Sequence, residues 1–492
     1  MNFMSKLEET LNVSATENLA LGYKTTGKAL LDLNFAVASL RSQTEDDIIK
    51  QYMKAYHEDA KNAIIWLFFA RDIRGGLGER RLFRVVLNRL ANTADEYIDA
   101  IIPLVAEYGR FDDLFVLLYT KFENKIFDII KQQLESDIKG MESGENISLL
   151  AKWLPSINTS NKHSRKLARK IAANLGMNWQ TYRKQLAKLR KYLDIIECKM
   201  SACEFDKIKY ETVPSKANIK YKQAFLKQDE ERRLAFLESL KKETPGVKIN
   251  ADVLYPYDIV HAYTDKYDET LEQLWKALPD IPEIHNTIVV ADGSGSMLER
   301  IGGSSCTALE VANALAIYFA EHCSGHFKDK YITFSENPQL VDLSKGDSLH
   351  KKINIALRHR EIANTDIYKV FQLILKTAKN NNMSQEEIPQ NIIIISDMEF
   401  DQCADNANEK LFIKIANDYN IKGYKLPRLI FWNVNSRTGT IPVKQNDLGV
   451  ALVSGFSISI AKMIMSLELD PYKVLIEALN NPRYDAVRNA IK

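Results

Sequence analysis

The chain has 492 residues, a formal net charge of +2, 46% hydrophobic residues and 26% charged residues. These fractions are ordinary for a globular protein, and the length predicts roughly two to four domains. The nearly neutral balance excludes a chain that is acidic or basic as a whole, so the charge indicates a partner only through its local distribution.

The chain contains five scattered cysteines and no CxxC pair: Cys198, Cys203, Cys306, Cys323 and Cys403. An odd number of dispersed cysteines is not a disulfide framework, and it predicts a reducing environment. The N-terminal segment lacks the apolar core of a secretory signal. The apolar runs at 63–70 and 391–396 are too short to span a bilayer. We therefore expect a cytoplasmic protein that does not enter membranes.

Residues 1–282 are predicted to form one helix after another. Residues 60–74 carry apolar side chains all round, which is typical of a buried helix. After a glycine-rich turn, residues 79–92 place their apolar side chains on one face. Similar segments follow after short polar connections at 95–109, 111–122 and 124–138. This run of helical hairpins predicts an α-helical solenoid of the HEAT type, with repeats too degenerate to show a fixed period.

The pattern changes near residue 280, where Pro279 and Pro282 mark a linker. Short apolar segments predict strands at 287–292, 330–335, 338–344, 391–397, 428–434 and 449–455, the third of them a short edge strand. Amphipathic segments predict helices at 306–322, 366–380 and 408–419. Apolar strands that alternate with helices indicate a parallel sheet covered on both faces. We predict a doubly wound α/β domain at 283–468 and a helical tail at 469–492.

The sequence DGSGS at 292–296 follows the first of these strands and precedes a helix. Ligands of doubly wound sheets bind beyond the C-terminal strand ends, where the strand order switches. The loop there offers one carboxylate and two hydroxyls, and its glycines allow a tight turn. Such oxygen ligands suit Mg²⁺ or a similar divalent cation such as Mn²⁺. The predicted ligands are Asp292, Ser294, Ser296, Thr365 before a helix, and Asp397 at a strand end. The alternative is a polar loop in which Asp397 only caps a helix.

Eleven Lys and Arg residues, and no acidic residue, lie between Lys152 and Lys191. In two successive predicted helices the cations gather on one side, opposite an apolar stripe. Such a surface attracts a polyanion, and the binding depends strongly on salt. The candidate RNA-binding residues are Lys162, Arg165, Lys166, Arg169, Lys170, Lys184, Lys188 and Lys191. The alternative is a solvated face that acidic neighbours balance in space.

The set of DxSxS, a distal Thr and a later Asp at a strand end resembles the metal-ion-dependent adhesion site of von Willebrand factor A (vWA) domains. In that family the metal bridges to an acidic group of a bound protein, and this role is implied for Asp292, Ser294, Ser296, Thr365 and Asp397. Helices followed by a vWA domain resemble the Ro-type (TROVE) RNA-binding proteins. RDIRGGLGERRLF at 71–83 and LGMNWQTYRKQLAKLRKYL at 175–193 also resemble a related helical-plus-vWA family whose function is unknown.

The resemblance implies an arc- or ring-shaped scaffold that binds small non-coding or single-stranded RNA, as an RNA chaperone or quality-control factor. A protein-interaction module without RNA binding is the second hypothesis. A hydrolase that uses the metal is a third, less favoured one, because vWA sites lack an evident general base beside the metal. The sequence also shows no HExxH, GxSxG or catalytic Cys–His signature, so we expect no enzyme. The residues His322, Cys323 and His326 lack a fourth ligand at metal spacing, so we expect them to be structural.

Overall fold

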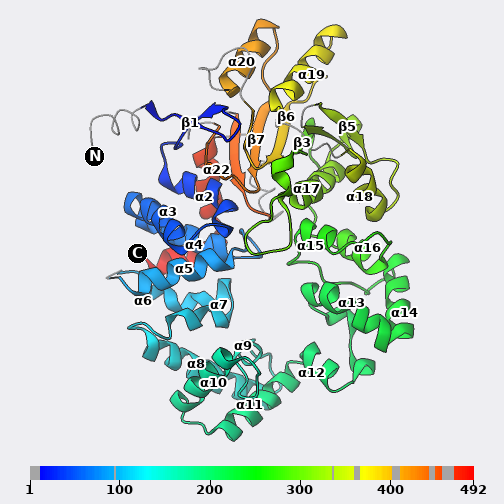
Figure 1. Cartoon of the computed structure of the whole chain (residues 1–492). Coiled ribbons are helices and arrows are strands. Elements are labelled where there is room, and N and C mark those ends of the chain that lie inside the picture. The colour runs from blue at the N-terminus through cyan, green and yellow to red at the C-terminus, as the bar shows by residue number, and fades with distance from the viewer. Residues whose placement is uncertain are drawn as a thin grey trace. The chain divides into compact units, whose positions relative to one another are not determined.

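The computed structural model describes residues 11–93, 96–334, 337–359, 366–401, 411–442, 449–456 and 470–492. A helical N-terminal region is followed by a C-terminal mixed sheet whose strands are mostly parallel (Figure 1). This finding confirms the predicted order of a helical part and an α/β part. Among the described residues, no helix is both long enough and apolar enough to cross a membrane.

The chain forms two compact units, each of which is described by itself. The first comprises Met1–Trp66, Arg74–Leu77 and Ala251–Pro482, and the second Leu67–Ile73, Gly78–Asn250 and Arg483–Lys492. These units do not follow the linear boundaries predicted after residues 282 and 468. Part of the reason is that the N-terminal helices pack against the sheet.

The sheet has the order β5-β4-β3-β6-β7-β8. Its strands are β3 (Thr287–Asp292), β4 (Lys330–Phe334), β5 (Gln339–Asp342), β6 (Asn391–Ser396), β7 (Arg428–Asn433) and β8 (Val450–Ser454). Neighbouring strands are parallel except at the edge, where β5 runs antiparallel to β4. Strand order reverses between β3 and β6. In open α/β sheets, ligands bind beyond the C-terminal strand ends at such a switch point.

The helices of the first unit are α2 (Ala29–Ala36), α3 (Glu45–Glu58), α15 (Pro256–His261), α16 (Glu269–Lys276), α17 (Ala308–His322), α18 (Leu349–Arg358), α19 (Ile367–Asn380), α20 (Leu411–Ile421) and α22 (Pro471–Leu479). Helix α18 was not predicted from the sequence. On β7, Phe431 packs edge to face against Phe412 of α20, whereas the next residue, Trp432, packs against Phe319 of α17. Since successive strand residues point to opposite faces, α17 and α20 cover opposite sides of the sheet (Figure 1).

The N-terminal segment pairs with loops at the C-terminal edge of the sheet, which the sequence analysis did not predict. It contains a small hairpin of β1 (Ser14–Ala15) and β2 (Leu21–Gly22). The Thr16 hydroxyl donates to the carbonyl oxygen of Phe400 at 2.6 Å, and Tyr23 pairs with Ile441 through two backbone hydrogen bonds. Helix α2 follows this segment, and Asn433 at the end of β7 donates to the carbonyl oxygen of Phe35 at 2.7 Å.

The second unit is helical throughout its described residues. Its helices are α5 (Arg80–Ala91), α6 (Ile98–Ile101), α7 (Val105–Tyr108), α8 (Glu123–Glu142), α9 (Leu150–Trp153), α10 (Lys162–Asn174), α11 (Trp179–Tyr192), α12 (Ile196–Ser201), α13 (Ser215–Gln228), α14 (Glu230–Lys241) and α23 (Asp485–Ala490), and α4 (Ala60–Arg71) contributes to both units. The helix predicted at 111–122 is a shorter 3-10 helix, Phe111–Leu117. Its fully buried Asp113 forms ion pairs with Arg71 and Arg84.

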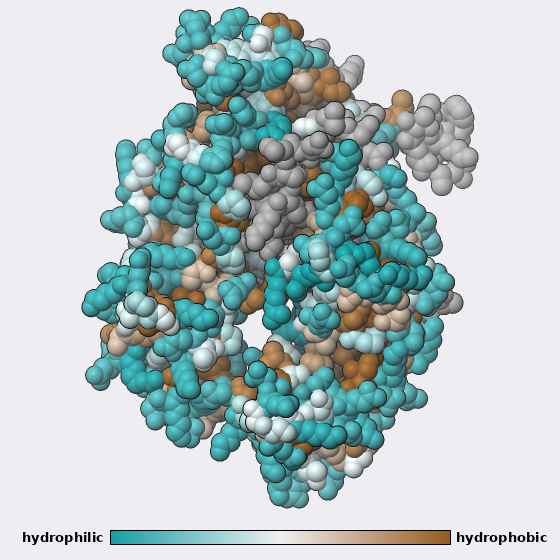
Figure 2. Space-filling model, turned by 180° about the vertical axis from the view of Figure 1, so that it is seen from behind, coloured by the Kyte–Doolittle hydropathy of each residue, from teal (hydrophilic) through white to brown (hydrophobic). Residues whose placement is uncertain are grey.

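Most of the surface seen in Figure 2 is hydrophilic. The exposed large apolar side chains include Tyr119, Trp179 and Leu340. Large apolar residues that are exposed singly are ordinary on such a surface.

Candidate metal site and basic surface

Asp292 ends β3, and the residues around it hold its carboxylate in place. One carboxylate oxygen, Oδ1, accepts a hydrogen bond from the backbone N–H of Ser294 at 2.9 Å. The other, Oδ2, accepts from the hydroxyl of Ser396, the last residue of β6, at 2.6 Å. The hydroxyls of Ser294 and Ser296 lie 3.0 Å apart. The structure thus brings the three ligands predicted on this loop together at the switch point of the sheet.

Asp397 follows β6 directly and lies beside Asp292. Each carboxylate belongs to a residue that is only 1% exposed. Burial raises the pKa of Asp292 to about 6. Burial, and then the negative charge of Asp292, raise the pKa of Asp397 to about 7, although a hydrogen bond from Ser296 acts in the opposite direction. A positive charge beside two buried carboxylates with raised pKa values would stabilise their ionised forms.

A divalent cation fits this donor set. Two carboxylates offset its charge, and they and the two hydroxyls supply the hard oxygen ligands that Mg²⁺ and Mn²⁺ prefer. Burial is the main cause of both raised pKa values, so a cation bound between the carboxylates would offset the cost of burying their charges. The fifth predicted ligand, Thr365, lies outside the described residues. The structure therefore places Asp292, Ser294, Ser296 and Asp397 together.

Sequence reasoning missed two residues that position this site. The guanidinium of Arg437, in the loop after β7, lies 3.5 Å from the Asp397 carboxylate and forms ion pairs with Glu17 and Glu299 at 2.7 and 3.0 Å. Glu399 is fully buried and accepts hydrogen bonds from the backbone N–H groups of Arg437 and Thr438 at 2.8 and 2.9 Å. No local pattern in the sequence marked either residue, because their partners come from distant loops.

The predicted basic residues lie on α10 and α11. Both helices begin with an asparagine cap, since the side chains of Asn161 and Asn178 accept hydrogen bonds from backbone N–H groups of the first turn. The buried side chains of each helix form one stripe, with Leu167 and Ile171 on α10 and Leu186 on α11 among its members. Apolar residues on the inner side leave the cations on the outer side of each helix.

Seven of the eight predicted cations have no carboxylate within ion-pair distance among the described residues: Lys162, Arg165, Lys166, Arg169, Lys184, Lys188 and Lys191. Arg165 is half-buried and the other six are exposed. The eighth, Lys170, pairs with Glu123 at 2.6 Å and donates to the carbonyl oxygen of Leu118 at 3.1 Å. For Lys170 the sequence alternative of a balanced charge is therefore right. We call the other seven residues the basic surface.

An exposed indole lies against this basic surface. Trp179, the first residue of α11, is 51% exposed, and the guanidinium of Arg169 lies 4.2 Å from its ring centroid. Tyr119 is 60% exposed, and the ammonium of Lys170 lies 4.2 Å from its ring centroid. Aromatic faces beside cations are typical of surfaces on which unpaired bases stack.

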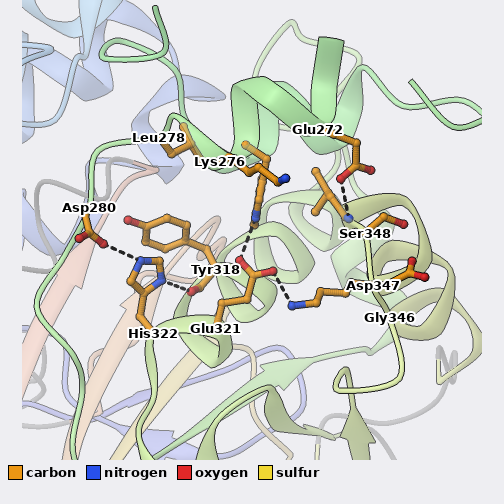
Figure 3. A pocket seen from close by; sticks show the side chains of 13 residues that line it. Glu272, Lys276, Leu278, Asp280, Tyr318, Glu321, His322, Gly346, Asp347 and Ser348 are labelled. Atoms are coloured by element: carbon orange, nitrogen blue, oxygen red, sulfur yellow. Dashed lines mark hydrogen bonds and ion pairs between the residues drawn. The ribbon is translucent and has the colours of Figure 1, made fainter. Parts of the chain in front are cut away.

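A polar cavity of about 490 Å³ lies between α16, α17 and α18 (Figure 3). Glu321 accepts from the Trp275 indole and pairs with Lys352, each at 2.8 Å. The two ring nitrogens of His322 lie 2.7 Å from the carbonyl oxygen of Tyr318 and 3.2 Å from the carboxylate of Asp280. These contacts agree with the structural role expected for His322.

Two family models match the chain: Domain of unknown function (DUF2828) over residues 110–287 and Domain of unknown function (DUF7788) over residues 286–477. These matches agree with the predicted resemblance to a family of unknown function that joins a helical part and a sheet. A protein of Acanthamoeba polyphaga mimivirus, described as uncharacterized, is 31% identical over 511 residues, which cover 95% of this chain and 87% of the viral protein. The chain therefore belongs to the same family as this mimivirus protein, with a DUF2828 region followed by a DUF7788 region.

Proposed function

We propose that this protein is an RNA-binding scaffold whose sheet carries a divalent-metal site of the vWA type. The observation that carries the RNA-binding part is the basic surface, whose seven cations have no carboxylate partner among the described residues. The alternative is a basic face that acidic neighbours balance in space. Within the described ranges, only Lys170 among the eight predicted cations fits it, since Glu123 offsets its charge. Unbalanced cations on two successive helices favour a polyanion, because phosphate contacts release condensed counterions.

The aromatic residues favour single-stranded RNA within this proposal. Trp179 is 51% exposed and has Arg169 over its ring, and bases can stack on such an aromatic residue only when they are unpaired. The resemblance to Ro-type proteins supports RNA over DNA. It also supports a HEAT-like solenoid as the scaffold that presents the basic surface.

We call the cluster of Asp292, Ser294, Ser296 and Asp397 the sheet site. It is proposed to recognise an acidic group on a protein partner. Asp292 and Asp397 would hold the cation, with Ser294 and Ser296 as hydroxyl ligands. When bound, the cation supplies an open coordination position for a carboxylate from the partner. Ser396 orients Asp292 through its 2.6 Å hydrogen bond, and the guanidinium of Arg437 lies 3.5 Å from the Asp397 carboxylate. We propose recognition and not hydrolysis, because the described neighbours of the ligands are engaged in positioning them.

Binding of labelled RNA to the full-length protein over a salt series tests the RNA-binding part. We expect single-stranded RNA to bind, with log affinity falling by about 0.7 per contacted phosphate for each unit of log salt concentration. The variant Lys166→Glu/Lys184→Glu/Lys188→Glu should bind at least about tenfold more weakly whatever the RNA sequence. Binding that ignores salt, or no binding at all, would contradict the proposal.

A protein-interaction module without RNA is the second candidate, and the buried ligand cluster of the sheet favours it independently of the basic surface. It predicts native protein whose absorbance ratio at 260 and 280 nm shows no nucleic acid. It also predicts that Asp292→Asn abolishes capture of a protein partner, whereas the triple charge reversal leaves capture unchanged.

A further inference from the structure

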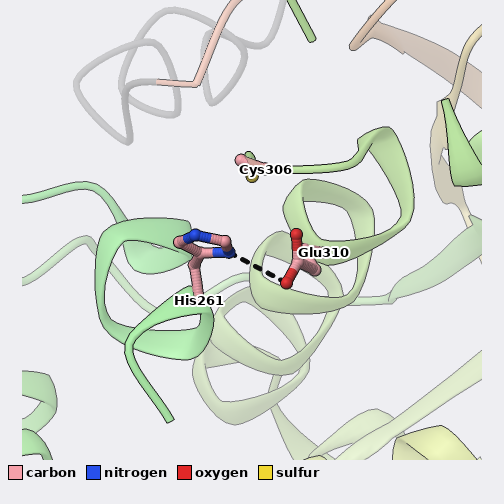
Figure 4. Close-up of side chains that lie close together, drawn as sticks. All are labelled: His261, Cys306 and Glu310. Atoms are coloured by element: carbon pink, nitrogen blue, oxygen red, sulfur yellow. Dashed lines mark hydrogen bonds and ion pairs between the residues drawn. The ribbon is translucent and has the colours of Figure 1, made fainter. Parts of the chain in front are cut away.

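A second cluster of metal-ligating side chains lies outside the Asp292 site (Figure 4). His261 is the last residue of α15, Cys306 precedes α17, and Glu310 lies in the first turn of α17. One potential ligand atom from each side chain lies within 4.8 Å of the others. Nitrogen, sulfur and oxygen donors therefore converge from two packed helices on one point.

Hydrogen bonds already orient the side chains of His261 and Glu310. One oxygen of Glu310, Oε2, accepts from the backbone N–H of Thr307 at 2.8 Å as part of the capping box of α17. The other, Oε1, lies 2.9 Å from Nδ1 of His261, while Nε2 of His261 lies 2.9 Å from the Ser305 hydroxyl. Metal-binding histidines commonly make such a contact through the second ring nitrogen, because it fixes the ring and its tautomer.

The electrostatics of the cluster also favour a cation. Cys306 is buried, and burial together with the charge of Glu310 raises the pKa of its thiol. A further positive charge at this point would stabilise the thiolate and the carboxylate together. A divalent ion would neutralise both negative charges at once.

We propose that His261, Cys306 and Glu310 bind one transition-metal ion of the zinc class through Nδ1, Sγ and Oε1. A mixed set of N, S and O ligands suits Zn²⁺ and excludes a preference for Mg²⁺. Binding would release the thiol proton to solvent, and the neutral His261 ring would carry its one proton on Nε2, which lies 2.9 Å from the Ser305 hydroxyl and would donate to it. The side chain of His261 is 36% exposed, so the fourth position faces water or a ligand from solution.

Such an ion would join the end of α15 to the start of α17. The chain between Ser296 and Thr307 connects the Asp292 loop to the start of α17. Glu299, which lies in this connecting segment, pairs with Arg437. The second metal would therefore hold the segment that leads away from the sheet site. This role is separate from RNA binding and from recognition at Asp292.

Titration of the metal-free full-length protein with Co²⁺ tests the proposal. We expect about one equivalent to bind with the tetrahedral ligand-field bands and the thiolate-to-cobalt absorption typical of a cysteine ligand. Cys306→Ser and His261→Ala should lose this absorption. Asp292→Asn should retain it, which separates this site from the sheet site. The double variant Cys198→Ser/Cys203→Ser, which removes the two exposed cysteines, should also retain it.

Absence of the thiolate-to-cobalt absorption in the wild-type protein would overturn the proposal, as would its persistence in Cys306→Ser. Circular dichroism of Cys306→Ser without metal shows whether the variant is folded, and Zn²⁺ should raise the Tm of the wild-type protein alone. If Cys306→Ser does not fold, Ser305→Ala provides the test. It should keep the absorption and weaken Zn²⁺ binding by about ten- to a hundredfold, and unchanged affinity would contradict the geometry.

Discussion

The sheet site and the basic surface handle charge in opposite ways. Asp292 and Asp397 are withdrawn from water, and hydrogen bonds from Ser294, Ser296 and Ser396 orient them. The seven cations of the basic surface are mostly exposed and lack carboxylate partners among the described residues. Burying a charge is costly unless a counter-charge arrives, whereas an exposed charge costs little and is screened by salt. The first arrangement selects a small cation by geometry; the second attracts a polyanion by charge density.

The largest expected effect is the loss of metal binding in Asp292→Asn. The side chain keeps its size but loses one of two negative charges that offset the cation, so we expect no measurable Mn²⁺ binding by calorimetry. Lys166→Glu on the basic surface is the matched control and should bind Mn²⁺ as the wild-type protein does. Equal Mn²⁺ affinity in Asp292→Asn and wild type would break the contrast between the two sites.

The second largest effect is expected from acidification, which should weaken Mn²⁺ binding at the sheet site but leave RNA binding at the basic surface nearly unchanged. Both buried carboxyls have raised pKa values, about 6 and about 7, so protons compete with the metal as the pH falls from 8 to 5. We expect Mn²⁺ affinity to drop by more than about a hundredfold over this range. RNA affinity should change little, because lysine and arginine stay charged. Metal affinity that does not vary with pH would show that the two carboxylates are not the ligands.

The metal-free fold should respond to pH with the opposite sign. An unfolded Asp has a pKa of about 3.9, below the folded values of Asp292 and Asp397, so the folded state takes up protons first as the pH falls. This pair should therefore stabilise the metal-free fold progressively from pH 8 down to about pH 4. Thermal unfolding of wild type and Asp397→Asn over this range, with a chelator present, isolates the contribution. A pH dependence that is the same in both proteins would contradict it.

On the basic surface, Trp179→Ala should weaken binding of single-stranded RNA by about 1–3 kcal/mol, the usual contribution of one stacked base. Duplex RNA should be affected much less, because its bases are already stacked. Lys170→Gln is the control, since its charge is offset by Glu123 and it contributes little net attraction. Equal losses for single-stranded and duplex RNA would show that Trp179 supports the helix and does not stack on bases.

Local patterns predicted the strands well because each is a short apolar run between polar turns. The run at 287–292 is β3 with the predicted bounds, and DGSGS follows it as expected. The segment 338–344 contains β5 at the sheet edge. The convergence of Asp292 and Asp397 followed from topology, since adjacent parallel strands end at one edge.

Contacts over long sequence separations were beyond such patterns. Pairing of Lys170 with Glu123 joins residues 47 positions apart, so an acid-free stretch concealed a balanced charge. The His261–Cys306–Glu310 cluster gave one local signal, a Cys just before a helix and a Glu in its first turn, four residues later. Its histidine comes from a helix 49 residues before the glutamate. The N-terminal hairpin pairs with loops almost 400 residues later in the sequence, for example through Thr16 and Phe400, which are 384 positions apart. Hydrophobic periodicity cannot predict such pairing.

Arg437 brings a positive charge to the sheet site. Its replacement should have the smallest effect on Mn²⁺ affinity among these predictions. Its guanidinium lies 3.5 Å from the Asp397 carboxylate, so it stabilises the ionised form in the metal-free protein and repels an arriving cation. We expect Arg437→Gln to raise Mn²⁺ affinity at pH 8 by up to about tenfold, and Arg437→Lys to change it less. The pKa of Asp397 should also rise, so the acid-induced loss of Mn²⁺ binding should begin at higher pH. Weaker Mn²⁺ binding by Arg437→Gln would instead mean that Arg437 acts by holding its loop, together with Glu17 and Glu299, against the site.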